Sequence, residues 1–170
     1  MTKEEYLESF IKAYQRYYDI HTDAVPDPFA AMAVFISHNE QYFLVKSAKV
    51  ADIDSEEYVY FILCDELTSD MLQTYDQTAW EDGLSKVTPN YGHRNTDITL
   101  YIICNHMSDD AFSLTRKLHH YKSYKHGFFG WSNYRLVTIE TSSERTSYNR
   151  QGRTLKKLVS NIIKQNHIKE

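Results

Sequence analysis

The sequence predicts a single domain of the α/β (α+β) class, spanning residues 1–170, in which helices flank a mixed sheet of five or six strands. The first observation is that apolar residues at helical spacing alternate with runs rich in β-branched and aromatic residues, in the order αβββαβαβα. The second is that 42% of the 170 residues are hydrophobic, which is enough for one substantial core. The third is that no linker-like stretch divides the chain.

Four segments have the helical pattern. The first carries a capping box, Thr2 with Glu5, while Ser69 and Ser108 are the expected caps of the second and third. Pro89 limits the second helix, because proline cannot continue a helix. We expect helices at residues 2–18, 69–86, 108–120 and 154–167.

Five segments have the composition of strands, namely residues 29–37, 41–50, 57–64, 97–105 and 133–141. A polar break at His38–Glu40 and a polar turn at Asp52–Ser55 predict that the first three form an antiparallel meander. The helices that follow predict crossovers to parallel neighbours. Residues 142–153 are expected to form a turn or a short added hairpin.

Charge is distributed unevenly along the chain, whose net charge is −4. Residues 1–110 hold 7 basic and 20 acidic side chains, a net of −13, whereas residues 111–170 hold 12 and 3, a net of +9. Such a chain presents a basic face to an anionic partner, or its basic third folds back onto the acidic part. Without a linker between the halves, we favour the second interpretation.

The most unusual stretch is residues 119–131 (HHYKSYKHGFFGW), where cations alternate with aromatic rings. This combination grips phosphate and stacks on bases in sites for single-stranded nucleic acid. The alternative, which the close spacing of the rings favours, is that Phe128, Phe129 and Trp131 pack into the core. The candidate ligand-binding residues are Lys122, Tyr124, Lys125, His126, Trp131 and Arg135.

The sequence contains no nucleophile elbow and no phosphate-binding glycine loop, so we expect no catalytic residues and no cofactor. Several side chains carry metal-ligand atoms but lack a recognised spacing, and we expect no metal site: His106, Asp109, Asp110, His119, His120 and His126. Cys64 and Cys104 lie in apolar runs and are expected to be buried, reduced thiols of a cytoplasmic protein. No apolar run approaches the ~18 residues of a membrane span.

The predicted order of helix, meander, helix and strand is similar to the core of the restriction-endonuclease-like nucleases. That family sets an acidic residue on the second strand and a Glu-x-Lys pair on the third, to bind magnesium and polarise water. Here Glu40 opens the second expected strand, which carries Lys46 and Lys49, whereas the third follows Glu56 and contains no lysine. The resemblance implies the fold without an intact catalytic signature.

A second resemblance rests on the run from Tyr121 to Trp131, the Arg135-Leu136 pair that follows, and the segment 39–44 (NEQYFL). These are similar to small uncharacterised proteins of anaerobic Gram-positive bacteria, grouped as a domain of unknown function. Their shared pattern is Tyr/His-Lys-Ser-Phe-Lys-x-Gly-Phe-x-Gly-Trp before an Arg-Leu strand. The resemblance spans nearly the whole chain and implies no activity.

We therefore expect a non-catalytic cytoplasmic protein that acts by binding or self-association, with a second copy or another protein as partner and no membrane contact. Its 14 tyrosines support this, since tyrosine is enriched at interfaces. The alternative is a nucleic-acid-associated protein of restriction-endonuclease-like fold. In that case a weak, salt-sensitive affinity for polyanions is centred on Lys122, Lys125 and Arg135. Four further basic residues contribute to it: Arg150, Arg153, Lys156 and Lys157.

Overall fold

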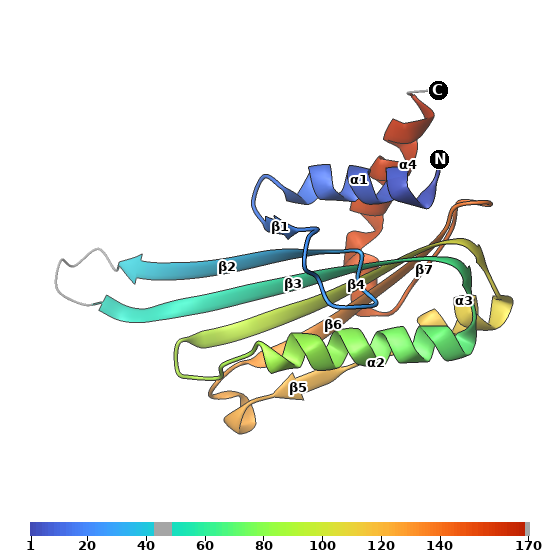
Figure 1. The fold of residues 1–170 in the computed structure, drawn as a ribbon. Coiled ribbons are helices and arrows are strands. Elements are labelled where there is room, and N and C mark those ends of the chain that lie inside the picture. Colours follow the sequence, from blue (N-terminus) through green and yellow to red (C-terminus); the bar gives the residue numbers. More distant parts are fainter. Residues whose placement is uncertain (43–48, 169–170) are drawn as a thin grey trace.

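The computed structural model, which describes residues 1–42 and 49–168, has three layers (Figure 1). A mixed sheet of seven strands lies between two helical layers, as the sequence predicts for the fold class. The strands are β1 (Asp19–His21), β2 (Ala31–Tyr42), β3 (Lys49–Leu67), β4 (His93–Met107), β5 (Tyr121–Ser123), β6 (Trp131–Glu140) and β7 (Arg145–Tyr148). The helices are α1 (Lys3–Tyr14), α2 (Ser69–Ser85), α3 (Asp109–Thr115) and α4 (Lys156–His167), with 3₁₀ turns η1 (Lys125–Gly127) and η2 (Gln151–Leu155). Among the described helices, none combines the length and apolar character needed to cross a membrane.

The strand order is β1-β2-β3-β4-β6-β5, with β7 also paired to β6. Neighbours from β1 to β3 are antiparallel, whereas β3, β4 and β6 are parallel to one another. The crossovers through α2 and α3 are therefore confirmed, as is the added hairpin that contains β7. The extra strands β1 and β5 have three residues each and lie in segments expected to be loops.

The expected division into three N-terminal strands is wrong. His38 and Glu40 do not break the chain but lie inside β2, where they pair with Asp54 and Asp52 of β3. The backbone hydrogen bonds of an antiparallel pair continue regardless of side-chain polarity, so polar residues need not end a strand. Lys49 is consequently the first residue of β3. Of the strand expected at 41–50, residues 43–48, with Phe43, Leu44 and Lys46, lie outside the described part of the chain.

Helix ends follow local side chains. The capping box of α1 is present, with Glu5 N donating to Thr2 Oγ1 at 3.2 Å. The cap of α2 is Thr68 rather than Ser69, because Thr68 keeps an extended backbone and accepts from Met71 N at 3.3 Å. Ser108 caps α3 as expected, but this helix ends at Thr115 rather than near residue 120. Beyond it the chain turns towards the sheet edge.

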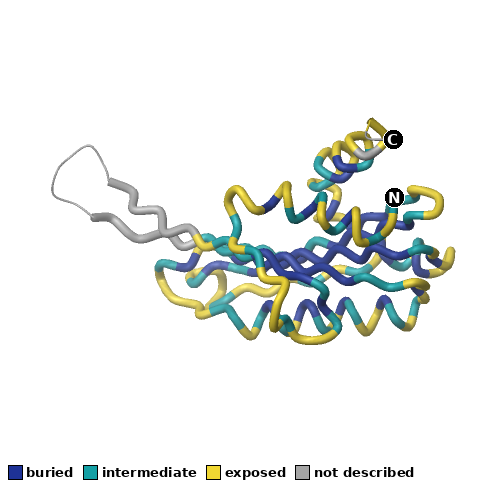
Figure 2. The backbone as a smooth tube through the Cα atoms, turned by 45° about the horizontal axis from the view of Figure 1, so that its top comes forward, coloured by how far each residue is buried: buried dark blue, intermediate teal, exposed yellow. Residues whose placement is uncertain are grey.

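The core consists of two apolar clusters, one on each face of the sheet. Figure 2 shows that buried residues are concentrated in the central strands. On one face α1 and α4 pack against side chains such as Phe61 and Tyr101. On the other, α2 and α3 pack against side chains such as Tyr60 and Leu100. From residue 97 to 103 of β4 and along β6, odd-numbered positions therefore face α1 and α4, and even-numbered positions face α2 and α3. Both cysteines are free thiols, as expected, but only Cys104 is buried, and Cys64 is half-buried.

Candidate functional site

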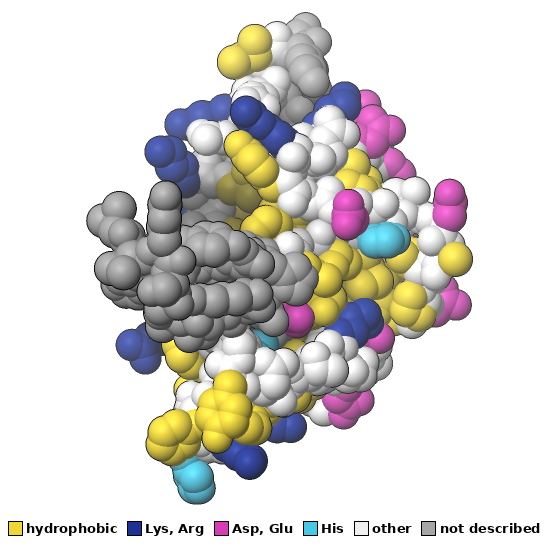
Figure 3. Space-filling view, turned by 90° about the vertical axis from the view of Figure 1, so that its left-hand side faces the viewer, with side chains coloured by type: hydrophobic (Ala, Val, Ile, Leu, Met, Phe, Trp, Pro, Cys, Tyr) yellow, Lys and Arg dark blue, Asp and Glu magenta, His cyan; other side chains and the backbone are white. Residues whose placement is uncertain are grey.

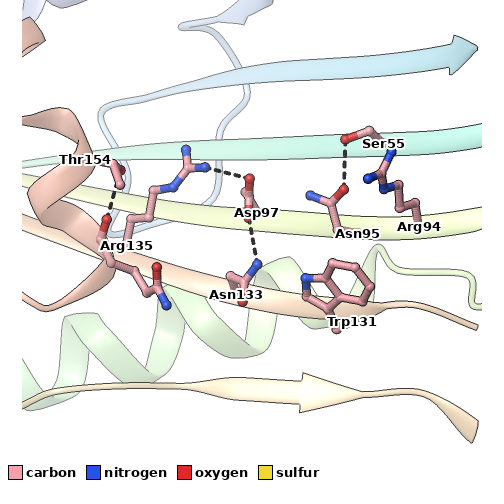
Figure 4. Close-up of a pocket in the computed structure, with 9 residues that line it drawn as sticks. Ser55, Arg94, Asn95, Asp97, Trp131, Asn133, Arg135 and Thr154 are labelled. Carbon is pink, nitrogen blue, oxygen red and sulfur yellow. Dashed lines mark hydrogen bonds and ion pairs between the residues drawn. The ribbon is translucent and has the colours of Figure 1, made fainter. Parts of the chain in front are cut away.

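A polar trough lies on the α1/α4 face of the sheet, where β4 and β6 begin (Figure 4). Its volume is about 390 Å³, within the range of small-molecule sites. Strands β3, β4 and β6 form the floor and η2 forms one wall. Its lining residues are Ser55, Arg94, Asn95, Asp97, Trp131, Asn133, Arg135, Gln151 and Thr154.

An ion network fixes one end of the trough. Arg135 donates to Glu57 Oε1 at 3.1 Å and to Asp97 Oδ2 at 2.6 Å. Asn133 Nδ2 donates to the other oxygen of Asp97 at 3.2 Å, and Tyr18 donates to Glu57 at 2.5 Å. Burial raises the pKa of Glu57, against the opposing effects of the Tyr18 hydrogen bond and the Arg135 charge. Both carboxylates are thus held by a cation instead of being free to transfer protons.

Trp131, the first residue of β6, forms the opposite end, with Arg94 beside it. Both residues also line a smaller cavity of about 220 Å³ formed with Tyr91 and Phe128. The Phe128 side chain is 76% exposed and that of Tyr91 is 84% exposed. We call Tyr91, Phe128 and Phe129 the aromatic rim. Figure 3 shows exposed hydrophobic side chains beside histidine and basic side chains at the lower edge of this end of the molecule.

Phe128 and Phe129 of the rim are carried by a loop with a strained backbone. Lys125 and His126 have φ angles of +44° and +52°, which side chains with a Cβ rarely adopt. Gly130 has φ +79°, and a Cβ there would lie 2.2 Å from the Arg94 carbonyl oxygen. The buried His93 holds the loop, because its Nδ1 donates to the Phe129 carbonyl at 2.7 Å. Such strain persists only where surrounding contacts impose it, and it is found most often at functional sites.

The structure separates the six ligand-binding residues that the sequence indicates. Trp131 and Arg135 lie together in the trough. Tyr124 lies on the opposite face, where its hydroxyl is 2.8 Å from Ser132 Oγ and burial raises its pKa. Exposed Lys122 lies over the Tyr124 ring, with Nζ 5.6 Å from the centroid.

The remaining two, Lys125 and His126, are exposed on η1 at the rim. Lys125 Nζ lies 4.8 Å from the centroid of the Phe129 ring. These two residues therefore lie beside the aromatic rim and do not line the trough.

The favoured expectation that the loop rings pack into the core is wrong. Phe128 is exposed, and Phe129 and Trp131 are only half-buried. Phe128 and Phe129 lie in the turn between β5 and β6, outside both strands, so neither ring is placed on a face of the sheet. Trp131, the first residue of β6, faces the trough.

Sequence reasoning missed most of the trough. Asn95 and Asp97 on β4, and Asn133 with Arg135 on β6, are polar residues at alternate positions where apolar strands begin. This period of two places them on one face of the sheet. This alternation of polar residues at the start of two apolar strands was the sequence signal that could have indicated the trough.

The histidines and basic residues have separate environments. His120 Nε2 lies 2.6 Å from buried Asp76 and stacks on Trp80, whereas His106 contacts Ser142. No group of three metal-ligating side chains occurs in the part of the chain that the structure describes. Ion pairs of Arg135 with Glu57 and Asp97, and of Arg145 with Asp109, support the interpretation that the basic third folds onto the acidic part.

Comparison of the sequence with known protein families identifies the family of this chain. The sequence profile of the domain of unknown function DUF8052 matches residues 2–161, nearly the whole chain, and the chain belongs to this family. No curated protein and no solved structure matches it.

Proposed function

We propose that this member of the DUF8052 family is a non-catalytic cytoplasmic protein, of bacterial origin, that binds a small polar ligand in the trough. The aromatic rim serves as the adjoining contact surface. The observation that carries the proposal is the strained loop, which holds Phe128 in solvent beside an open polar trough.

The lining of the trough supports a polar, ring-shaped ligand. Eight of its nine lining residues offer hydrogen-bonding or charged side chains, and Trp131 supplies the one aromatic wall. Arg135 is already paired with Glu57 and Asp97, so recognition rests on hydrogen bonds from the polar lining and on the Arg94 cation. A carboxylate that already accepts two charge-assisted or amide hydrogen bonds is a poor general base, which supports a binding role over a catalytic one.

Tryptophan fluorescence tests the proposal, because Trp80 is 8% exposed and Trp131 lines the trough. Nucleosides and methyl glycosides are the probes, and W131F identifies the signal of Trp131. We expect saturable quenching by one of these classes, weakened about tenfold or more in N133A, since a lost hydrogen bond to a polar ligand costs about 1.4 kcal/mol or more. Y17A, which removes an exposed tyrosine outside the trough, is the matched control.

Self-association through the rim is measured in the same preparations by sedimentation velocity. If the wild type self-associates, its sedimentation coefficient rises with protein concentration. The F128A variant should show no such rise. If no probe saturates and the wild-type coefficient is independent of concentration, the binding proposal is wrong.

Binding of single-stranded nucleic acid is the second candidate, and the rim favours it. Exposed Tyr91 and Phe128 offer stacking surfaces, with Arg94 and Lys125 close to them. The order of α1, the antiparallel β1–β3, α2 and the parallel β4 also supports the likeness to restriction-endonuclease-like proteins.

The test of this candidate is anisotropy of labelled ten-residue deoxythymidine and uridine strands at 20 and 200 mM salt. Binding at low salt that weakens steeply with salt, and is lost in F128A, is expected. Absence of binding at 20 mM salt contradicts it.

A further inference from the structure

A second cavity of about 390 Å³ lies on the other side of η2, between the end of α3, β7 and the start of α4. Its lining residues are Arg116, Thr146, Ser147, Tyr148, Arg153 and Lys156. Half of them are cationic and none is acidic. We call it the basic pocket.

Three cations from separate segments converge there without neutralising partners. Arg116 caps the C-terminus of α3, Arg153 lies in η2, and Lys156 is the first residue of α4. Within the described chain, none of the three forms an ion pair with a carboxylate. Because all three cations line one cavity, an anion that enters it is attracted by each of them.

Aromatic contacts and a hydrogen bond hold the walls in place. The Arg116 guanidinium lies 4.6 Å from the centre of the Phe112 ring, and Lys156 Nζ lies 5.7 Å from that of Tyr148. Ser147 Oγ donates to the Phe112 carbonyl at 2.8 Å, which ties β7 to α3. Cation–π contacts orient the side chains without cancelling their charge, so all three cations remain available to a ligand.

We propose that the basic pocket is a binding site for a phosphate group, carried by a small phosphomonoester or as inorganic phosphate. Two guanidinium groups offer bidentate hydrogen bonds to phosphate oxygens, and the lysine adds a point charge. The site is distinct from the trough, which lies across η2 and contains a carboxylate.

The test is thermal unfolding and ³¹P NMR of the full chain with inorganic phosphate and with glycerol phosphate, at constant ionic strength. We expect the melting temperature to rise by about 3–5 °C at ten times the dissociation constant. R153Q and K156Q should each weaken binding about tenfold, because each removes one charge-assisted contact. K157Q and R150Q alter neighbouring exposed cations outside the pocket and should bind like the wild type.

Residues 153 and 156 are both exposed, so their variants should melt like the wild type when phosphate is absent. Tighter binding of glycerol phosphate identifies an esterified ligand, and tighter binding of inorganic phosphate identifies the free ion. The proposal is overturned if phosphate causes no ³¹P broadening or melting shift. It is equally overturned if sodium chloride at the same ionic strength gives the same shift, or if R153Q/K156Q retains the affinity.

Discussion

Replacing Arg135 by methionine removes the cation that holds two carboxylates at the floor of the trough. The side chains of Arg135, Glu57 and Asp97 are 22, 15 and 17% exposed, so all three are largely withdrawn from water. Removing one partner of a buried ion pair costs about 3–5 kcal/mol. Because some exposure remains, we expect a loss of about 3 kcal/mol in the free energy of unfolding at pH 7.5. For a chain of this length, that loss lowers the melting temperature by about 10 °C.

The pH dependence gives a sharper test. Burial already raises the pKa of Glu57, and Arg135 opposes that rise, so R135M should raise this pKa further. A carboxyl group whose pKa is higher in the folded state takes up a proton on folding, and stability therefore falls as the pH rises through that pKa. The loss in the free energy of unfolding caused by R135M should therefore increase between pH 5 and pH 8 and decrease on acidification.

Urea unfolding of wild type and R135M at pH 5.0, 6.5 and 8.0 measures this deficit. The double variant R135M/E57Q should recover part of the lost stability, because it removes one of the two carboxylates that R135M leaves without a cation. R150M, which changes an exposed arginine, should lie within ~0.5 kcal/mol of wild type. A deficit below ~1 kcal/mol at pH 8.0, or one that does not change with pH, would refute the reasoning.

Further predictions concern the loop and the thiols. G130A should cost more than ~2 kcal/mol in urea unfolding, because its Cβ would meet the Arg94 carbonyl at a positive φ, and wild-type stability would contradict this. F128A should change stability by less than ~0.5 kcal/mol, since the ring is exposed, and a larger loss would place it in the core. Without denaturant, a thiol reagent should label Cys64 before Cys104, because a hydrogen bond from Cys104 lowers the pKa of Cys64 and burial protects Cys104. Equal labelling rates, measured by mass spectrometry, would be inconsistent with this order.

Much of the architecture could be predicted because it depends on neighbouring residues. The capping box at Thr2 and Glu5 and the serine cap at Ser108 act over three residues, so the pattern alone locates two helix starts. The crossovers follow from the alternation of strand and helix. The long β2–β3 pair was missed because a polar segment is also compatible with a continuous ladder.

The residues of the candidate site could not be predicted to lie together from the sequence. They become neighbours only through the register between β4 and β6. Asn95 pairs with Trp131, and Asp97 pairs with Asn133, across 36 residues of chain in both cases. The local pattern shows which strand positions share a face but not which strands become neighbours or with what offset. The exposure of Trp131 likewise depends on which part of the sheet α4 covers. No residue near Trp131 in the sequence determines the position of that helix.

Residues 151–156, which comprise η2 and the first residue of α4, contribute side chains to the walls of both cavities. Gln151 and Thr154 face the trough, whereas Arg153 and Lys156 face the basic pocket. Residues three apart share one side of a helical turn, so a small rotation of this segment moves both walls together. Any occupant of one cavity that rotates the turn therefore changes the affinity of the other. Thermodynamic linkage requires that change to be the same factor in both directions, so two cavities that share no ligand would still report on each other's occupancy.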